Sequence, residues 1–230
     1  MSTDAPLSRR DRLRAQTLDE IRMHAWAQVD AGGAHALSLN AIAKAMGMSG
    51  PALYRYFASR DELLGALVIE GYGDLVATLR DAAAAAARKA PAARVAAVAA
   101  AYRAWALAHP RRYVMLFDPR PDDIGDSPEA IATIHEGMVV LLEALGDAAP
   151  DGGPGAGRGR GRGRGRDKLD QQLERWARSR DTLLDLPAAV LRAGVLAWTQ
   201  LHGTVSLELA GALPAMGLDA GLLVEAGLED

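Results

Sequence analysis

The chain has 230 residues, half of them hydrophobic and 5% aromatic, with no cysteine and a formal net charge of −3. This length allows a sizeable core in one domain or two small ones, and the wealth of Ala and Leu favours an all-α fold. The missing cysteines exclude a disulfide framework or thiolate metal site, and the slight negative charge means that any DNA contact requires a local basic surface.

The N-terminal residues predict a long first helix with a basic start. Residues 1–8 are polar, are expected to be disordered, and lack the apolar core of a signal peptide. The arginines that follow are either a solvated helix start or an arm that grips DNA phosphates. The helix is predicted to end at Gly32-Gly33. The basic start consists of Arg9, Arg10, Arg12 and Arg14. The predicted buried side consists of Leu18, Ile21, Ala25, Trp26 and Val29.

Residues 37–63 read as two short helices joined by a tight turn and followed by a third helix. Ser38 is a natural N-cap, and Gly47 supplies the left-handed position that ends the first of these helices. Ser49 is the predicted cap of the second helix. Leu53 and Phe57 point inward at i and i+4 spacing, while Pro51, Ala52, Tyr54, Arg55 and Tyr56 face outward. A short helix set across a preceding one by a glycine turn is typical of the DNA-reading helix-turn-helix.

This stretch resembles the N-terminal module of the TetR family of bacterial repressors. The resemblance implies a helix-turn-helix domain in residues 1–62 and a ligand-binding and dimerisation domain in residues 63–230. It also implies a homodimer that binds palindromic, double-stranded operator DNA and responds to a small-molecule effector. The matching positions are Ile42-Ala43, Gly47-Met48-Ser49, Ala52-Leu53-Tyr54, Tyr56-Phe57 and Ser59-Arg60 to Leu63.

The candidate DNA contacts lie on both helices of the motif and at the start of the next helix. Polar side chains there would contact phosphates or bases, and small residues let the backbone approach the bases. Asn40 either reads adenine through its amide or is a solvated residue at a helix start. Arg60 is a candidate because the corresponding family position often faces phosphate. The full set is Ser38, Asn40, Ser49, Gly50, Pro51, Ala52, Tyr54, Arg55, Tyr56 and Arg60.

The next helix opens with a capping box, in which Ser59 caps forward and Glu62 reaches back. It keeps helical spacing up to the alanine tract, and it is the only link evident in the sequence between the two predicted domains. Gly71 and Gly73 lie within it. They allow either close packing against a neighbour or a bend that transmits ligand binding.

Prolines and glycines divide the remainder of the chain into helices. Pro91, Pro110 and Pro128 each begin a helix, and Arg94 and Arg103 interrupt the Ala-rich stretch that a membrane span would need. We therefore expect a cytoplasmic protein without a membrane partner, associated with the nucleoid when bound to DNA. Residues 147–166 end in a Gly-Arg run and are predicted to be disordered, either as a nucleic-acid tether or as a tolerated loop insertion.

The C-terminal part predicts three helices, for a total of nine or ten. An amphipathic helix runs from Leu169 to Leu183, a long apolar helix from Pro187 to near Gly211, and a last short helix over residues 218–228. Two adjacent apolar rows on the long helix indicate two buried sides, one of which could face a partner subunit. The sequence from Trp198 through His202 to Gly203 resembles the WHG C-terminal domain of a branch of the TetR family.

Aromatic, methionine and histidine side chains on the apolar faces of the predicted helices should face one another inside the helical body. They are core residues by default, but such a bundle could also enclose a flat or amphipathic ligand, oriented by a histidine or tyrosine. The TetR resemblance implies a pocket for a largely apolar or aromatic effector. The candidate ligand-binding residues are Tyr102, Trp105, His109, Tyr113, Phe117, Met138, Trp198 and His202.

Nothing in the sequence predicts a catalytic residue, a cofactor or a metal site. The five histidines form no H-E-x-x-H pair, and there is no Walker loop, dinucleotide fingerprint or G-x-S-x-G elbow. The prediction is a ligand-responsive transcriptional regulator, with repression as the expected action. Two alternatives stay open: a helical enzyme or carrier with a three-helix N-terminus, and an architectural or RNA-associated protein that uses the Gly-Arg run.

Overall fold

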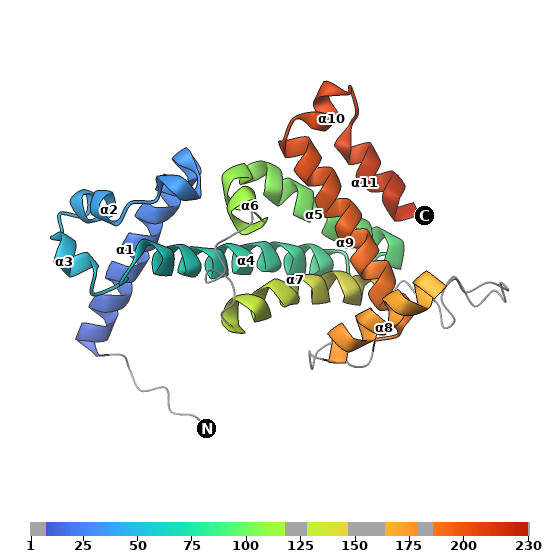
Figure 1. Ribbon diagram of the computed structural model, residues 1–230, viewed down its shortest axis with the longest axis horizontal. Helices are drawn as coiled ribbons and strands as arrows, with labels where there is room; N and C mark the ends of the chain where they lie inside the picture. Colours follow the sequence, from blue (N-terminus) through green and yellow to red (C-terminus); the bar gives the residue numbers. More distant parts are fainter. Residues whose placement is uncertain (1–7, 118–127, 147–163, 179–185, 230) are drawn as a thin grey trace. The chain divides into compact units, whose positions relative to one another are not determined.

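The computed structural model describes residues 8–117, 128–146, 164–178 and 186–229 (Figure 1). Over these ranges the chain forms eleven α-helices, one 3-10 helix and no strand, which confirms the predicted all-α fold. The predicted count of nine or ten helices was too low. It omitted α10 (Ala212–Ala215), a single turn that begins after Gly211 in the left-handed conformation. Within the described ranges, no helix is long and apolar enough to cross a membrane.

The chain packs into two compact units. The first contains Met1–Gly71 and His109–Ile131, and the second contains Tyr72–Ala108 and Ala132–Asp230. This division by packing is not the functional division predicted between residues 62 and 63, because the helix after His109 packs with the N-terminal helices. Each unit is therefore made from two separate stretches of sequence.

The first unit is built around α1 and the start of α4. The α1 helix begins after Ser8, whose Oγ accepts a hydrogen bond from the Asp11 N–H, and ends at Gly33, where φ is +79°. Its predicted buried residues are buried except Leu18, which is half-buried. The elements of this unit are α1 (Arg9–Gly32), η1 (Ala34–Ala36), α2 (Leu39–Ala45), α3 (Gly50–Leu53), the first part of α4 (Arg60–Ala85), α6 (Pro110–Phe117) and the start of α7 (Pro128–Gly146).

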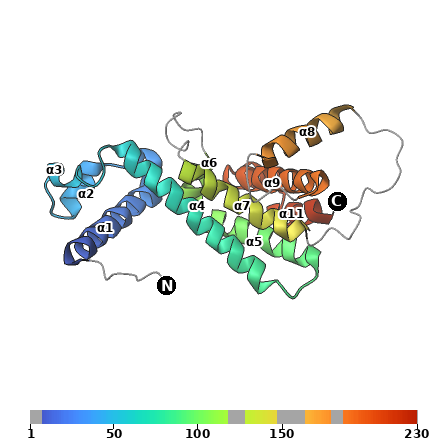
Figure 2. The same cartoon turned by 90° about the horizontal axis from the view of Figure 1, so that it is seen from below.

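The second unit is organised by α9, which contacts α5, α8, α10 and α11. Figure 2 shows α8 and α11 beside α9. A buried cluster from α7, α8 and α9 holds part of this unit together, and each fully buried leucine in it contributes about 1.5–3 kcal/mol. An ion pair between Arg192 and Asp170 joins α9 to α8. Besides the ends of α4 and α7, the helices are α5 (Pro91–Ala108), α8 (Arg164–Arg178), α9 (Ala188–Leu209), α10 and α11 (Ala220–Glu229).

One predicted boundary was wrong. Residues 164–166, placed by the sequence in a disordered segment, form the first turn of α8. Once the stripe of Leu169 and Leu173 is packed, each further residue adds a helical hydrogen bond at little cost, so the helix extends upstream. The rest of the predicted disordered segment, and the predicted end of this helix beyond Arg178, lie outside the described residues.

Candidate nucleic-acid interface

The first half of the interface is α2 and the turn that follows it. Ser38 caps α2 as predicted, since its Oγ accepts a hydrogen bond from the Ala41 N–H at 3.3 Å. Leu39, Ile42 and Ala43 are buried and hold the helix against the rest of the unit. Gly47 has φ of +65°, a conformation that other residues rarely adopt. The turn at Gly47 therefore fixes the direction in which the chain enters α3.

The second half is α3, which is only one turn long. Leu53 is fully buried and Phe57 nearly so, whereas Pro51, Tyr54 and Arg55 are exposed. The chain continues past α3 in a further turn, where the Tyr56 N–H donates to the Leu53 carbonyl at 2.8 Å. The two buried anchors thus turn Pro51, Tyr54 and Arg55 outward as predicted, whereas Ala52 and Tyr56, which were also predicted to face outward, are half-buried.

Three features of this segment were not predicted. Ser49 occupies the N-cap position of α3, but its side chain makes no capping hydrogen bond, so the expected cap was wrong. The guanidinium of Arg14 lies 5.0 Å from the centre of the Tyr56 ring, which brings one arginine of the basic run beside the segment. Asn40 is also close, since its Oδ1 lies 3.9 Å from the position that a Cβ on Gly50 would take.

Arg60 is turned towards the connection between α1 and α2. Its Nη2 donates to the Ala34 carbonyl at 2.6 Å, and its Nε donates to the Leu37 carbonyl at 3.2 Å. Its Nη1 lies 3.3 Å from Asp61 Oδ1. These partners lie far upstream or beside Arg60 in the sequence, and nothing in the local pattern pointed to them.

The capping box at the start of α4 is present with one change. Ser59 Oγ accepts a hydrogen bond from the Glu62 N–H at 3.0 Å, as predicted. The carboxylate of Glu62 reaches back to the N–H of Ala58 at 2.5 Å, one residue earlier than a capping box normally requires. The two bonds together secure the end of the helix-turn-helix to α4.

Three of the five candidate ligand residues in the second unit, Tyr102, Trp198 and His202, form a polar and aromatic group. Tyr102 Oη lies 3.1 Å from Nδ1 of His202, and the Trp198 ring stacks on His202 with centroids 5.2 Å apart. Burial lowers the pKa of His202, which favours the neutral imidazole. Trp105 donates from Nε1 to Asp74 at 2.8 Å, and Met138 packs on the α7–α8–α9 cluster.

The other three candidates, His109, Tyr113 and Phe117, belong to the first unit. Tyr113 is buried, and its ring lies 4.8 Å from that of Phe117. Tyr113, Met115 and Leu116 form the buried side of α6. Tyr113 and Phe117 therefore contribute to the packing of α6, and His109, directly before this helix, is half-buried.

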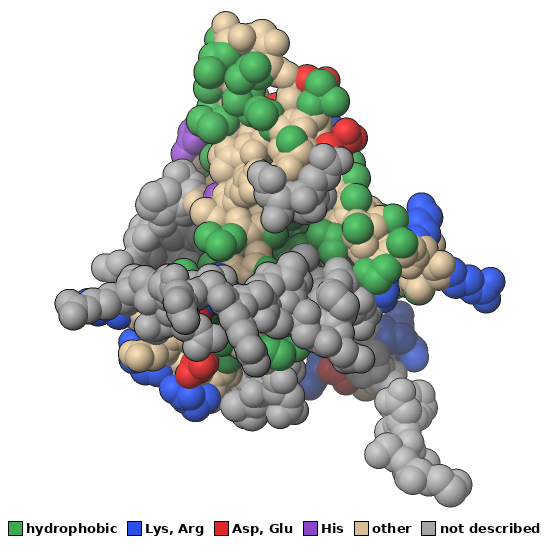
Figure 3. Space-filling model, turned by 90° about the vertical axis from the view of Figure 1, so that its right-hand side faces the viewer, with side chains coloured by type: hydrophobic (Ala, Val, Ile, Leu, Met, Phe, Trp, Pro, Cys, Tyr) green, Lys and Arg blue, Asp and Glu red, His purple; other side chains and the backbone are tan. Residues whose placement is uncertain are grey.

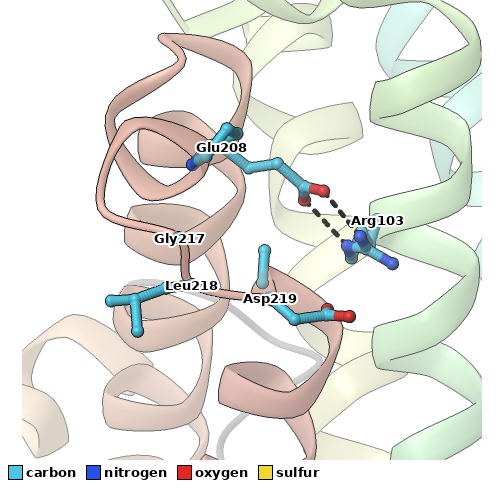
Figure 4. Close-up of a pocket in the computed structure, with 7 residues that line it drawn as sticks. Arg103, Glu208, Gly217, Leu218 and Asp219 are labelled. Atoms are coloured by element: carbon cyan, nitrogen blue, oxygen red, sulfur yellow. Dashed lines mark hydrogen bonds and ion pairs between the residues drawn. The ribbon is translucent and has the colours of Figure 1, made fainter.

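A separate pocket of about 410 Å³ lies where α5, the end of α9 and the start of α11 meet (Figure 4). Glu208 accepts two hydrogen bonds from Arg103, at 2.8 and 2.5 Å, and this carboxylate raises the pKa of the guanidinium. No predicted ligand residue lines the pocket. Its lining consists of Arg103, Glu208, Pro214, Gly217, Leu218, Asp219 and Ala220. Among the described residues, no group of three or more His, Asp or Glu side chains is placed to hold a metal ion.

The capped α2, the glycine turn and the anchored α3 define a helix-turn-helix protein of the DNA-binding class. Residues 23–67 match the family of bacterial regulatory proteins described as the tetR family, and residues 95–230 match the tetracyclin repressor-like C-terminal domain. The chain therefore belongs to the TetR family and is a transcriptional regulator, a kind of protein that is not an enzyme. The predicted family is confirmed.

Similar proteins cover most of the chain. The HTH-type transcriptional regulator Rv1816 of Mycobacterium tuberculosis is 42% identical over 196 residues, which are 84% of this chain and 81% of that protein. The regulator Mb1846 of Mycobacterium bovis gives the same values. The solved structure of SCO4313 has a TM-score of 0.74 and 39% identity, covering 97% of this chain and 98% of that one. A protein from Rhodococcus sp. RHA1 shares the fold, with a TM-score of 0.66 and 22% identity over 92% of this chain and 91% of its own.

Proposed function

We propose that the chain is a ligand-responsive repressor that binds a palindromic operator as a homodimer and is released by a small, largely apolar or aromatic effector. In this proposal residues 1–62 bind DNA in the cytoplasm, and residues 63–230 bind the effector and dimerise. The observation that carries the DNA-binding part is the exposed segment at Pro51, Tyr54 and Arg55, held outward by buried Leu53 and Phe57. In a dimer, two such segments would enter major grooves about 34 Å apart.

The residues around this segment divide into three roles. Tyr54 and Asn40 are exposed and polar, and we assign them to base edges or nearby phosphates. Gly50 and Ala52 are small enough to allow close approach. Arg55, with Arg14 beside Tyr56, supplies local positive charge on a chain whose net charge is negative.

The homodimer is supported by apolar side chains exposed on the C-terminal helices. Hydrophobic side chains gather around α10 and the neighbouring turns (Figure 3). Surfaces of this kind are often buried between subunits. The sequence favours α9 as the main contact, and the exposed side chains extend this surface to α10 and α11. The large apolar side chains exposed there are Leu196, Leu207, Met216, Leu218, Leu222 and Leu223.

The effector part rests on the group of Tyr102, Trp198 and His202. A neutral, half-buried imidazole beside a tyrosine hydroxyl can orient a ligand by hydrogen bonding, and the indole offers a flat apolar face. A ligand that binds one conformation better by several kcal/mol would move most of the population to that conformation. Release from the operator follows if that conformation spaces the two α3 segments wrongly for DNA.

The test begins with a footprint of the full chain on the DNA upstream of its own gene and with selection from random duplexes. We expect a palindromic site and a dimer in sedimentation at the same protein concentration. Asn40→Ala and Tyr54→Ala should each weaken binding to that site at least about tenfold while leaving the dimer intact. Arg88→Ala, which removes an exposed charge outside the helix-turn-helix, is the control and should bind normally. A monomer, or equal binding to all duplexes, contradicts the proposal.

A further inference from the structure

The connection between α1 and α2 is held in place by two side chains from outside it. The connection runs from Gly33 to Ser38 and includes only the short η1 helix. Arg60 binds the carbonyls of Ala34 and Leu37, at 2.6 and 3.2 Å. Gln28 of α1 holds it as well, since its Oε1 accepts a hydrogen bond from the Ser38 N–H at 2.8 Å. A charged donor on two carbonyls is among the stronger hydrogen-bonding arrangements in proteins.

This connection fixes the position at which α2 begins. Leu37 is followed at once by Ser38, whose side chain caps α2, and then by the first turn that carries Asn40. Asn40 in turn lies next to the start of α3 at Gly50. The position of the Leu37 carbonyl therefore helps to set where the N-terminal turn of α2, with its exposed Asn40, lies relative to Arg60 of α4.

We propose that Arg60 is a positioning residue for operator binding and that it acts through the start of α2 instead of gripping phosphate. This inference rests on the proposed function. The Nε and Nη2 groups of the guanidinium already donate to backbone carbonyls, and the carboxylate of Asp61 beside Nη1 offsets the positive charge. A phosphate that took either of the two N–H groups that bind these carbonyls would release the connection that presents Ser38 and Asn40.

The two roles predict different responses to salt. A side chain that neutralises a phosphate releases counterions, so its loss reduces the slope of log affinity against log salt by about 0.9 for each contact. A positioning residue changes the affinity by the same factor at every salt concentration. The rigid fork of arginine also matters, because a lysine ammonium has the same charge but cannot reach two carbonyls in this geometry.

The experiment compares Arg60→Lys, Arg60→Gln and Arg55→Gln in the full chain. Binding to a labelled duplex carrying the footprinted site is measured by anisotropy between about 50 and 200 mM salt. Amide hydrogen exchange of residues 34–41 is measured without DNA. We expect both Arg60 variants to bind about tenfold more weakly at every salt concentration, with the wild-type slope and with faster exchange in this segment. Arg55→Gln should reduce the slope and leave the exchange unchanged.

The outcomes separate the two proposals. Wild-type affinity in both Arg60 variants, or a reduced slope in Arg60→Gln that Arg60→Lys restores, overturns the positioning role. Unchanged exchange of residues 34–41 in both variants also overturns it, whether or not DNA binds. If the wild-type chain prefers no sequence, the proposed repressor function fails, and the exchange experiment still decides whether Arg60 holds the connection.

Discussion

Arg112 on α6 donates two hydrogen bonds to the carboxylate of Asp30 on α1, at 2.8 and 2.6 Å. The same guanidinium lies 4.4 Å from the centre of the Trp26 ring. The indole N–H of Trp26 donates in turn to Glu70 of α4 at 3.0 Å. One arginine therefore ties α6 to α1 at a point where α1 is also joined to α4, and this explains why α6 packs with the N-terminal helices.

The Arg112–Asp30 pair should contribute to stability in a pH-dependent way. Hydrogen bonding from Arg112 lowers the pKa of Asp30 below its usual value of 3.8. A carboxyl group with a lower pKa in the folded state stabilises the fold fully above its usual pKa, and the contribution is lost as the pH falls through the folded-state value. Asp30→Asn should therefore cost about 1 kcal/mol at pH 7, a modest figure because the side chain of Asp30 is 42% exposed.

Urea unfolding at neutral pH and below pH 4 measures this effect. The difference between wild type and Asp30→Asn should shrink as the pH falls. Arg112→Lys separates the contributions, because it keeps the charge while losing the second hydrogen bond and the planar stacking on Trp26. An equal difference at both pH values would count against the pair as the source of the stabilisation.

Two glycines of α4 should respond oppositely to alanine. At Gly71 a Cβ would lie 3.1 Å from Leu116 Cδ2 and 3.1 Å from Trp26 Cη2, whereas at Gly73 it would meet nothing within 4 Å. Alanine in a helix is favoured over glycine by about 1 kcal/mol, so Gly73→Ala should stabilise the protein by up to that amount. At Gly71 the same gain is opposed by overpacking of about 1–3 kcal/mol, and the net effect should be destabilising.

Thermal unfolding of the two variants checks this contrast. The helix passes through both positions without interruption, so the comparison isolates the space around each residue. At Gly71 the contacts support the close-packing interpretation of the sequence. A stabilising Gly71→Ala would show that Leu116 and Trp26 can move aside without cost.

The sequence was sufficient where structure is set by neighbours in the chain. Ser38, Gly47 and Leu53 act within a few residues of themselves, through a cap, a left-handed turn and an inward face, so their roles could be predicted. The same holds for the end of α1 at Gly33. Local signals of this kind define a helix-turn-helix almost completely.

The sequence failed where the partner is distant. The carbonyls bound by Arg60 lie 23 and 26 residues upstream, and Asp30 lies 82 residues before Arg112. Such pairs depend on how helices pack, which no spacing rule contains. For the same reason Arg60 was assigned to phosphate by resemblance, although its nearest partners are backbone carbonyls. The sequence also indicated α4 as the link between the two predicted domains and gave no sign that α6 packs on α1.

The ion pair between Arg103 and Glu208 should matter more than the Arg112 pair. The carboxylate is the better buried of the two, since the side chain of Glu208 is 15% exposed and that of Asp30 is 42% exposed, and the two hydrogen bonds join α5 to α9. Arg103→Met should cost about 2–3 kcal/mol, because it leaves a largely buried carboxylate without its partner. The double variant Arg103→Met with Glu208→Met should recover part of that loss, which denaturant unfolding would detect. A double variant as unstable as the sum of the single ones would argue against direct coupling.

Burial of His202 should make the protein less stable in mild acid. Its pKa is lowered from the usual 6.5, so the unfolded chain takes up a proton before the folded one does. Stability is then unaffected above pH 6.5, falls as the pH drops below that value, and levels off once the folded state is also protonated. A glutamine in place of His202 takes up no proton in this range, so the stability lost between pH 7.5 and pH 5.5 should be smaller for His202→Gln than for wild type. Tyr102→Phe, which removes the hydroxyl 3.1 Å from Nδ1, should cost about 1 kcal/mol at pH 7.5 and leave the acid loss present. Identical acid losses in wild type and His202→Gln would mean that the folded protein accepts the proton on this ring as readily as the unfolded chain does.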